Sequence, residues 1–385
     1  MQQKVLVVGD DGINSLGIVR SLGEVGIKSD AIITSSDNKK VHLLKSRYLG
    51  RGYVIPKNEE DLLDALLDYG RKNGNGFLFP TSDFVLNVIG THSDILRQFY
   101  VMPSVSEEIG SLSDILSKEK MAYYAEQAGF TIPKMRKCHI DSFGRIPSES
   151  ISFFAEEYPL ILKSDSILVP GCDFKIVDNE EELVSFLRGY PNKTVIIQKY
   201  INDAQEIAVQ CVGFGRVRKP DAYGVIYKIR TSVFALGTTT YAELKEFNDP
   251  ILKKACCTFS ELLEFSGLYD LDILIKDQKL YFIECNFRNG SNGYAYTKAG
   301  CNLSYLWLRD SFRNKDEANN NAYCEFHEIS FVNDIGDFAH VLKKTISPVK
   351  WLKQYLSADC RLLFDFRDQE PFWSEVIDLI RKKSH

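Results

Sequence analysis

One stretch of the sequence decides the fold: YDLDILIKDQKLYFIECNFRNGSNG, residues 269–293. It is typical of a β-hairpin, because two apolar runs flank a three-residue loop, 277–279, which is a common hairpin length. Counting outward from this loop gives three cross-strand pairs on one apolar face: Ile275 with Tyr281, Ile273 with Ile283, and Leu271 with Cys285. On the opposite face, Asp272 lies directly across from Glu284, and Asn286 follows two residues later.

The two carboxylates of this hairpin predict a metal site. Carboxylates that face one another across a β-ladder repel, so the register makes sense if a cation lies between them. Oxygen ligands from Asp272, Glu284 and Asn286 suit Mg²⁺, which commonly shares its shell with water and nucleotide phosphate. Leu274 and Phe282 share this face and indicate that it is covered. The alternatives are a solvated surface hairpin and a two-residue loop with a different register.

The first hundred residues alternate short apolar runs with segments of helical periodicity. The expected strands are 4–9, 30–34 and 77–80, and the expected helices are 14–25 and 59–72. This alternation predicts a parallel sheet with crossover helices. Gly9, Gly12 and Gly17 follow the first strand, but their spacing matches neither a dinucleotide-binding loop nor a P-loop. A plain strand-to-helix turn is therefore the better interpretation.

The character of the sequence changes at about residues 105–116. A helix that begins near Ser117 ends at Gly129, with Pro133 beyond it. The pattern that follows predicts a small α+β lobe: strands at 160–163, 174–177 and 194–200, a loop at 164–173 and a helix at 179–187. Further on come two sheet-like runs, a helix at 250–265, and two amphipathic helices in the last 75 residues, SPVKWLKQYL and EPFWSEVIDLIRKK.

Length and composition exclude several classes of protein. At 385 residues the chain exceeds one average domain of roughly 150 residues, so two or three packed units are expected. Its 44% hydrophobic and 26% charged residues are typical of a globular protein. A net charge of −5 without a concentrated basic stretch argues against nucleic acid as a partner. Without an apolar signal core or a run of about 18 apolar residues, we expect a cytoplasmic protein with no membrane span.

The cysteines and histidines give no metal or disulfide pattern. The nine cysteines are odd in number and form no CxxC pair, which favours reduced thiols over a disulfide framework or a structural zinc site. The six histidines show no HExxH spacing, so a histidine-based metal site has little support.

The spacing of Asp272, Glu284, Asn286 and Arg288 resembles the magnesium and phosphate signature of the ATP-grasp superfamily, and the resemblance spans nearly the whole chain. In that family a carboxylate precedes Glu-x-Asn-x-Arg at this distance. The resemblance implies an α/β and α+β fold of the carboxylate–amine ligase branch, similar to carbamoyl-phosphate-synthase-like and D-aspartate-ligase-like proteins. The implied parts are a Rossmann-like pre-ATP-grasp domain (1–112), a small lobe with a 118–130 helix (113–200), a large lobe with the Mg²⁺ and phosphate site (201–310), and a C-terminal helical extension (311–385).

The same resemblance implies the nucleotide contacts. Lys118 and Lys163 look like the two nucleotide lysines of the family. Segment 196–201 resembles the hinge whose backbone recognises adenine, and Glu206 stands where the ribose hydroxyls are usually bound. The expected hinge residues are Gln198, Lys199, Tyr200 and Ile201. The alternative is an interdomain strand with a surface glutamate.

Three basic residues are the expected catalytic groups. Lys228 and Arg230 resemble residues that reach the γ-phosphate or the acceptor, although a solvated strand face is the alternative. Arg288 supplies a guanidinium that can hold phosphate or carboxylate, or stabilise an oxyanion. The loop at 164–173 departs from the glycine-rich pattern of the family, so Ser164 and Ser166 would cover phosphate there.

Near the N-terminus, FLFPTSD places Thr81, Ser82 and Asp83 after a parallel strand, at the edge where α/β sheets bind ligands. Substrate contact is the hypothesis for these residues, and a helix N-cap by Ser82 or Asp83 is the equal alternative.

The reaction that the resemblance implies is activation of a carboxylate by ATP as an acylphosphate, attack by an amine, and release of ADP and phosphate. The implied cofactors are ATP and Mg²⁺, with Mn²⁺ as a substitute metal. The implied partners are a small acid and an amine, such as an amino acid, a sugar acid or a peptidoglycan-type precursor. The alternatives are a bicarbonate-using carboxylase relative and an ATP-binding sensor or scaffold with weak or no turnover. The oligomeric state stays open, and a homodimer is the commonest symmetric assembly.

Overall fold

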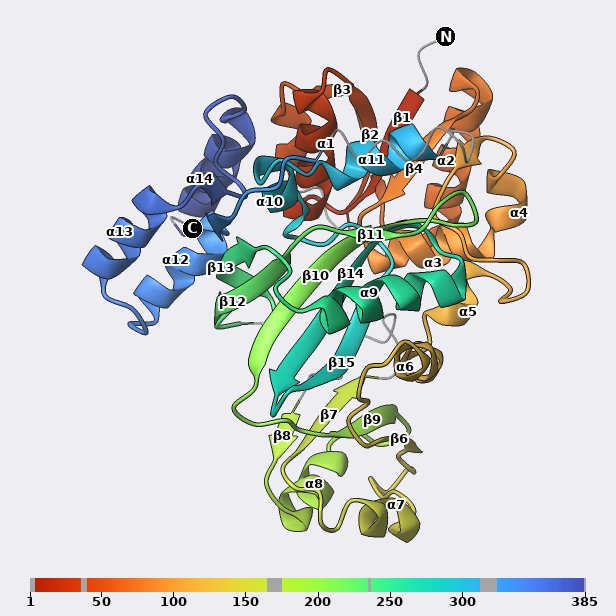
Figure 1. The fold of residues 1–385 in the computed structure, drawn as a ribbon, viewed down its shortest axis with the longest axis vertical. Coiled ribbons are helices and arrows are strands. Elements are labelled where there is room, and N and C mark those ends of the chain that lie inside the picture. The colour runs from red at the N-terminus through yellow and green to blue at the C-terminus, as the bar shows by residue number, and fades with distance from the viewer. Residues whose placement is uncertain (1–3, 36–39, 165–174, 235–236, 312–323, 384–385) are drawn as a thin grey trace.

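The computed structural model describes residues 4–35, 40–164, 175–234, 237–311 and 324–383. These residues form three sheets, which follow one another from top to bottom of Figure 1: a five-stranded, an eight-stranded and a four-stranded sheet. The mixed α/β and α+β character expected from the sequence is confirmed.

The five-stranded sheet is parallel throughout, with strand order β3-β2-β1-β4-β5. Its strands are β1 (Lys4–Gly9), β2 (Ser29–Ser35), β3 (Leu49–Pro56), β4 (Gly76–Pro80) and β5 (Tyr100–Val101). The connecting helices are α1 (Ile13–Glu24), the 3₁₀ helix η1 (His42–Lys45), α2 (Glu59–Asn73), α3 (Asp83–Thr91) and α4 (Ser93–Leu96). The predicted alternation is confirmed. Strand β3 is an addition that the pattern did not indicate, because this edge strand is largely exposed and has no buried face.

The four-stranded sheet is antiparallel, with order β6-β9-β7-β8. Its elements are β6 (Met135–His139), α7 (Ser148–Phe153), β7 (Leu160–Ser164), β8 (Lys175–Val177), α8 (Glu180–Leu187) and β9 (Thr194–Lys199). Two helices precede it, α5 (Leu112–Ile115) and α6 (Lys118–Gln127). Gly129 follows α6 with a φ of 98°, which confirms the glycine that was expected to end this helix.

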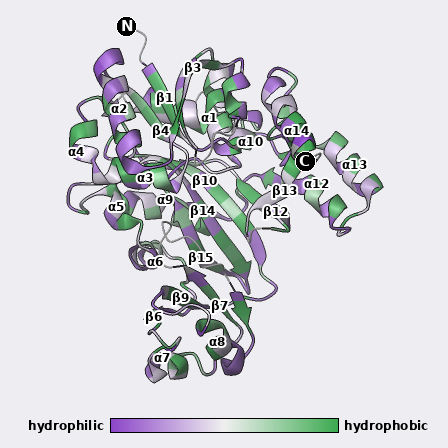
Figure 2. Cartoon of the chain, turned by 180° about the vertical axis from the view of Figure 1, so that it is seen from behind, coloured by the Kyte–Doolittle hydropathy of each residue, from purple (hydrophilic) through white to green (hydrophobic). Residues whose placement is uncertain are grey.

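The eight-stranded sheet carries the hairpin, and its order is β15-β14-β10-β12-β13-β16-β17, with β11 paired to β10. The strands are β10 (Gln205–Phe214), β11 (Asp221–Ala222), β12 (Val225–Thr231), β13 (Thr239–Lys245), β14 (Ser266–Lys276), β15 (Lys279–Asn286), β16 (Ile329–Val332) and β17 (Cys360–Arg361). Its helices are α9 (Pro250–Leu263), α10 (Gly293–Lys298) and α11 (Leu303–Asp310). Figure 2 shows hydrophobic residues along the central strand β10 and a mixture of hydrophobic and hydrophilic residues along β14.

Side chains of β10 alternate between two cores, as the period of a strand requires. Ile207 and Val209 face one core with α9, whereas Ala208 and Val212 face another core with α10 and α11. Both cores also contain residues of the five-stranded sheet, so these two parts of the molecule pack as one unit. The four-stranded sheet has a separate core of its own around Leu162.

The last segment differs from the helical extension that was expected. Helices α12 (Asp334–Leu342), α13 (Pro348–Ser357) and α14 (Glu370–Lys383) are present, but β16 and β17 extend the eight-stranded sheet beyond β13. These strands are short, which is why no apolar alternation indicated them. None of the helices in the described part of the chain has the length and hydrophobicity that crossing a membrane requires.

The expectation of reduced thiols throughout is wrong for one pair. Cys301 and Cys324 form a disulfide across a 23-residue separation, with Cα atoms 4.7 Å apart, a distance that a disulfide can span. The free cysteines in the described ranges are Cys138, Cys211, Cys256, Cys257, Cys285 and Cys360, and Cys172 lies outside those ranges.

Candidate active site

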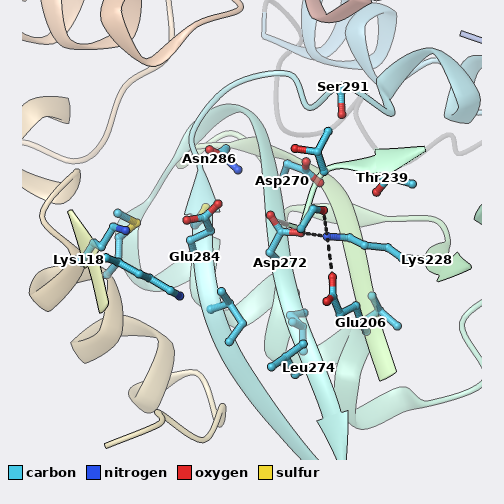
Figure 3. A pocket seen from close by; sticks show the side chains of 18 of the residues that line it. Lys118, Glu206, Lys228, Thr239, Asp270, Asp272, Leu274, Glu284, Asn286 and Ser291 are labelled. Atoms are coloured by element: carbon cyan, nitrogen blue, oxygen red, sulfur yellow. Dashed lines mark hydrogen bonds and ion pairs between the residues drawn. The ribbon is translucent and has the colours of Figure 1, made fainter. Parts of the chain in front are cut away.

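A cavity of about 710 Å³ lies between the eight-stranded sheet, helix α6 and the four-stranded sheet (Figure 3). Its walls combine carboxylates and amides from β14 and β15 with lysines from α6, β7 and β12. One end reaches the five-stranded sheet through Asn14 and Asp83. Residues that are far apart in the sequence therefore meet in one chamber.

The hairpin brings the two expected carboxylates together. Asp272 pairs directly with Glu284, and Asn286 pairs with Asp270, as the predicted register requires near the site. The predicted three-residue turn is wrong. Only Asp277 and Gln278 lie between the two strands, and both have positive φ.

A β-bulge reconciles the shorter turn with the predicted pairing of the carboxylates. Beyond Asp272 the register shifts by one residue, so Ile273 pairs with Phe282 rather than with Ile283. Phe282 therefore points into the core with Phe259, and its expected place on the carboxylate face is wrong. Ile283 lines the cavity instead.

Lys228 forms an ion pair with one of these carboxylates, Asp272. Its Nζ lies 2.5 Å from Asp272 Oδ1, 3.9 Å from Glu206 Oε2 and 2.8 Å from the Gly237 carbonyl oxygen (Figure 3). Burial opposes its charge, but attraction to Asp272 outweighs that effect and raises the pKa of Lys228. Within the described residues, no side chain forms a hydrogen bond or an ion pair with the Glu284 carboxylate.

Two further lysines face the hairpin from the opposite wall. Lys118 is the first residue of α6, and Lys163 is near the end of β7. Lys163 Nζ donates a hydrogen bond of 3.0 Å to Gln198 Oε1. Burial lowers the pKa of Lys163 to about 8; Glu284 opposes this shift and Lys118 adds to it. Two lysines on the same wall make it suited to an anion such as phosphate.

The hinge residues line the same chamber beside Glu206. The Lys199 side chain turns aside to form an ion pair of 2.6 Å with Glu157. The backbone N–H groups of Lys199 and Tyr200 donate to the carbonyl oxygens of Lys134 and Pro159 at 2.8 and 3.0 Å.

Arg230 is not at the site. Although it lies only two residues from Lys228, a bulge in β12 between them turns its side chain away. It forms two hydrogen bonds of 2.9 and 2.7 Å with the buried Asp337 and lies over the Tyr241 ring. Because Arg230 is absent from the described cavity lining, we no longer assign it a catalytic role.

Arg288, in contrast to Arg230, lines the cavity. Its Nε and one terminal nitrogen donate to the two oxygens of Asp83 at 2.7 and 2.9 Å. The same terminal nitrogen is 3.1 Å from Asn286 Oδ1, and the other is 3.2 Å from the Asn289 carbonyl oxygen.

The other two residues of the TSD segment have structural partners. The Thr81 hydroxyl is buried and lies 2.6 Å from the Ser15 hydroxyl. Ser82 caps α3 by accepting from the Val85 N–H at 3.4 Å. The N-cap alternative is therefore correct for Ser82, and the Asp83 carboxylate pairs with Arg288. The loop at 164–173, apart from Ser164 at the end of β7, lies outside the described residues.

Asp270 is a cavity residue that the sequence analysis missed. It shares a face with Asp272 and is 6% exposed, and any side chain at Gly290 would collide with its carboxylate. Burial and the nearby Asp272 raise the pKa of Asp270 to about 7. Its position two residues before Asp272 on the same strand was the available signal.

The oxygen groups at this end of the cavity fit a hard divalent cation. Asp272 and Glu284 face one another, and burial together with the nearby Asp272 carboxylate raises the pKa of Asp270 at the same place. No group of three or more His, Cys, Asp or Glu ligands exists within the described ranges, so the set depends on two carboxylates and the amide of Asn286.

Comparisons with known proteins identify relatives. No protein-family model matches the sequence. The chain is 29% identical over 140 residues to the carbamoyl phosphate synthase large chain of Sulfurisphaera tokodaii, covering 34% of this chain and 13% of that protein. The corresponding protein of Hyperthermus butylicus is 28% identical over 155 residues, 36% of this chain and 14% of its own length. The matched segments are thus about one seventh of these relatives' length.

Solved structures resemble the fold over most of the chain. An N5-carboxyaminoimidazole ribonucleotide synthetase in complex with ADP has a TM-score of 0.65 at 15% identity, covering 90% of this chain and 87% of that one. An L-amino acid ligase from Bacillus licheniformis has a TM-score of 0.61 at 15% identity, with coverage of 86% and 79%. The biotin carboxylase domain of 2-oxoglutarate carboxylase from Hydrogenobacter thermophilus, with MgADP and bicarbonate, has 0.62 at 17%, with coverage of 82% and 71%. The chain therefore shares its fold with these ligase and carboxylase structures, and about a third of its sequence is similar to carbamoyl phosphate synthase large chains.

Proposed function

We propose that the protein is an ATP-dependent ligase that activates a carboxylate as an acylphosphate and couples it to an amine, with release of ADP and phosphate. One observation carries this proposal: a single cavity has lysines on one wall, Lys118 and Lys163, and the carboxylate and amide oxygens of Asp272, Glu284 and Asn286 on the other. Phosphoryl transfer needs mainly positioning and charge neutralisation, and this arrangement is suited to both.

In this proposal the nucleotide binds between the two lobes. Lys118 and Lys163 hold phosphate oxygens, and Glu206 accepts hydrogen bonds from the ribose. Since the N–H groups of Lys199 and Tyr200 are already used, we assign adenine recognition to the backbone of Ile201, the next residue in the cavity lining.

Asp272, Glu284 and Asn286 would hold Mg²⁺, which supplies charge neutralisation at the transferring phosphoryl group when bound. Lys228 pairs with Asp272 and lies 3.9 Å from Glu206, and we assign it the γ-phosphate or the acceptor as its substrate contact. Arg288 donates to the oxygen that gains charge when the amine attacks the acylphosphate.

The described lining of the cavity has no nucleophile paired with a histidine base. No histidine is among its lining residues in the described ranges, and burial raises the pKa of its thiol, Cys285, well above the ordinary value. A neutral, buried thiol is a poor nucleophile. Activation of the acid by ATP is therefore the mechanism that these residues support.

The test is product analysis of purified protein with ATP, Mg²⁺, and pools of carboxylic acids and amines. ADP and phosphate that form only with a specific acid–amine pair would support the ligase. AMP and pyrophosphate would contradict the acylphosphate route.

Because one structural neighbour is a carboxylase domain with bound bicarbonate, a bicarbonate arm tests that second candidate. Nucleotide binding without turnover in any arm would favour a sensor. Glu284→Gln is the control, since it removes one charge at the proposed metal site.

A further inference from the structure

The N-terminal sheet contributes a charged side chain to the cavity in the form of Asp83. Asp83 opens helix α3 directly after β4, whereas Arg288 follows β15, 205 residues later in the chain. Two parallel hydrogen bonds of 2.7 and 2.9 Å join them, and both side chains are mostly buried, with 24% and 14% exposed. Such a bidentate pair fixes the plane of a guanidinium as well as its position.

Among the described residues, Arg288 is the side chain with which the Asp83 carboxylate forms hydrogen bonds. The N-cap of α3 is Ser82, so the Asp83 carboxylate is not needed to satisfy the helix. Asp83 is the first residue of the helix, where the helix dipole favours its negative charge.

The donors of Arg288 show what this contact does. A guanidinium has five N–H donors. Two go to Asp83, one to Asn286 Oδ1 and one to the Asn289 carbonyl oxygen, which leaves a single terminal N–H for a ligand. Arg288 also orients the amide of Asn286, a proposed metal ligand whose oxygen retains a second lone pair.

We propose that Asp83 is a positioning residue, through which the N-terminal sheet fixes Arg288 so that one N–H faces the reacting groups and the Asn286 oxygen faces the metal. This inference rests on the proposed ligase function. It assigns to the N-terminal sheet a role in the chemical step, distinct from substrate binding.

The kinetic test compares Asp83→Asn with Glu60→Gln, which makes the same charge change in the exposed first turn of α2. An amide offers one acceptor oxygen in place of two, so Asp83→Asn should lower kcat by about 10- to 100-fold, the usual effect of losing a supporting contact. The KM for ATP should change less than twofold, and Glu60→Gln should behave as wild type. A wild-type kcat for Asp83→Asn, or an effect on KM alone, would overturn the inference.

A double-mutant cycle then asks whether Asp83 acts through Arg288. In an Arg288→Lys background, which lacks the fork that matches a carboxylate, Asp83→Asn should cost less than twofold further. A full additional loss would show an independent role and overturn the positioning assignment.

One readout requires no turnover and separates failure of this inference from failure of the ligase proposal. The Nε–H proton of Arg288, assigned by NMR through its loss in Arg288→Lys, should exchange slowly with water and at least tenfold faster in Asp83→Asn. Equal exchange in both proteins would overturn the positioning role even in an active ligase. Slow exchange in a protein that turns over no substrate would refute the ligase proposal and with it a role in the chemical step.

Discussion

Raising the pH from 7 to 9 should weaken nucleotide binding about tenfold through one side chain, Lys163. Burial lowers the pKa of this lysine to about 8, with Lys118 contributing and Glu284 opposing. Below that pH the ammonium is present and attracts phosphate. Above that pH, Lys163 of the free protein is neutral. A nucleotide that binds must then bring back the proton on Lys163 to gain the same contact.

The magnitude follows from the fraction of protein that carries the proton. With a pKa of about 8, roughly nine tenths of the lysine is charged at pH 7 and roughly one tenth at pH 9. Bound phosphate raises the pKa, so the complex stays protonated over this range. The apparent Kd for the nucleotide should therefore rise about tenfold, with most of the change above pH 8.

The assay is calorimetric titration with a non-hydrolysable ATP analogue at constant ionic strength, at pH 7, 8 and 9. Proton uptake on binding should appear at pH 9 and be small at pH 7. Lys163→Gln should bind weakly at all three values and lose the pH dependence, whereas Lys175→Gln on the exposed edge of β8 should keep it. A Kd for the wild type that stays constant from pH 7 to 9 would refute the reasoning, as would the same pH dependence in Lys163→Gln.

Other variants test the remaining contacts. Glu284→Gln should abolish turnover with a Tm within about 2 °C of wild type, since its carboxylate forms no hydrogen bond or ion pair with a side chain in the described structure; near-normal turnover with unchanged Mg²⁺ dependence would contradict its metal role. Lys228→Met leaves Asp272 without its ammonium, so Mg²⁺ should raise Tm more in this variant than in wild type in a thermal melt; an equal rise would argue against a shared cation site. Arg230→Gln breaks the buried pair with Asp337 and should cost about 3 kcal/mol in urea unfolding while the Kd for the ATP analogue stays within twofold.

The part of the site that the sequence predicts is the part that a regular strand determines. A ladder with period two places Asp272 opposite Glu284 and Asn286 on the same face, and the structure has this arrangement. The turn escapes the same reasoning because Asp277 and Gln278 adopt positive φ without a glycine, the residue that usually indicates a two-residue turn.

Bulges and long-range contacts are what the sequence does not reveal. One bulge near Ile283 restores the register after the shorter turn, and another between Lys228 and Arg230 sends two similar side chains to different places. Neither bulge has a local signature in the residues around it. The pairing of Asp83 with Arg288 joins two separate sheets, so no periodicity in either segment could predict it.

The charges of the cavity differ in how firmly the fold holds them. Asp272 and Glu284 are fixed relative to one another by the hydrogen-bonded ladder of β14 and β15. Lys163 belongs to the four-stranded sheet, which has its own core. Its distance from the carboxylates therefore depends on the position of this sheet relative to the eight-stranded sheet. Arg288 follows β15 yet is held by Asp83, whose sheet shares both cores with the large sheet. A change in the spacing of the lobes should therefore alter contacts of Lys163 with phosphate before it disturbs the metal ligands or Arg288.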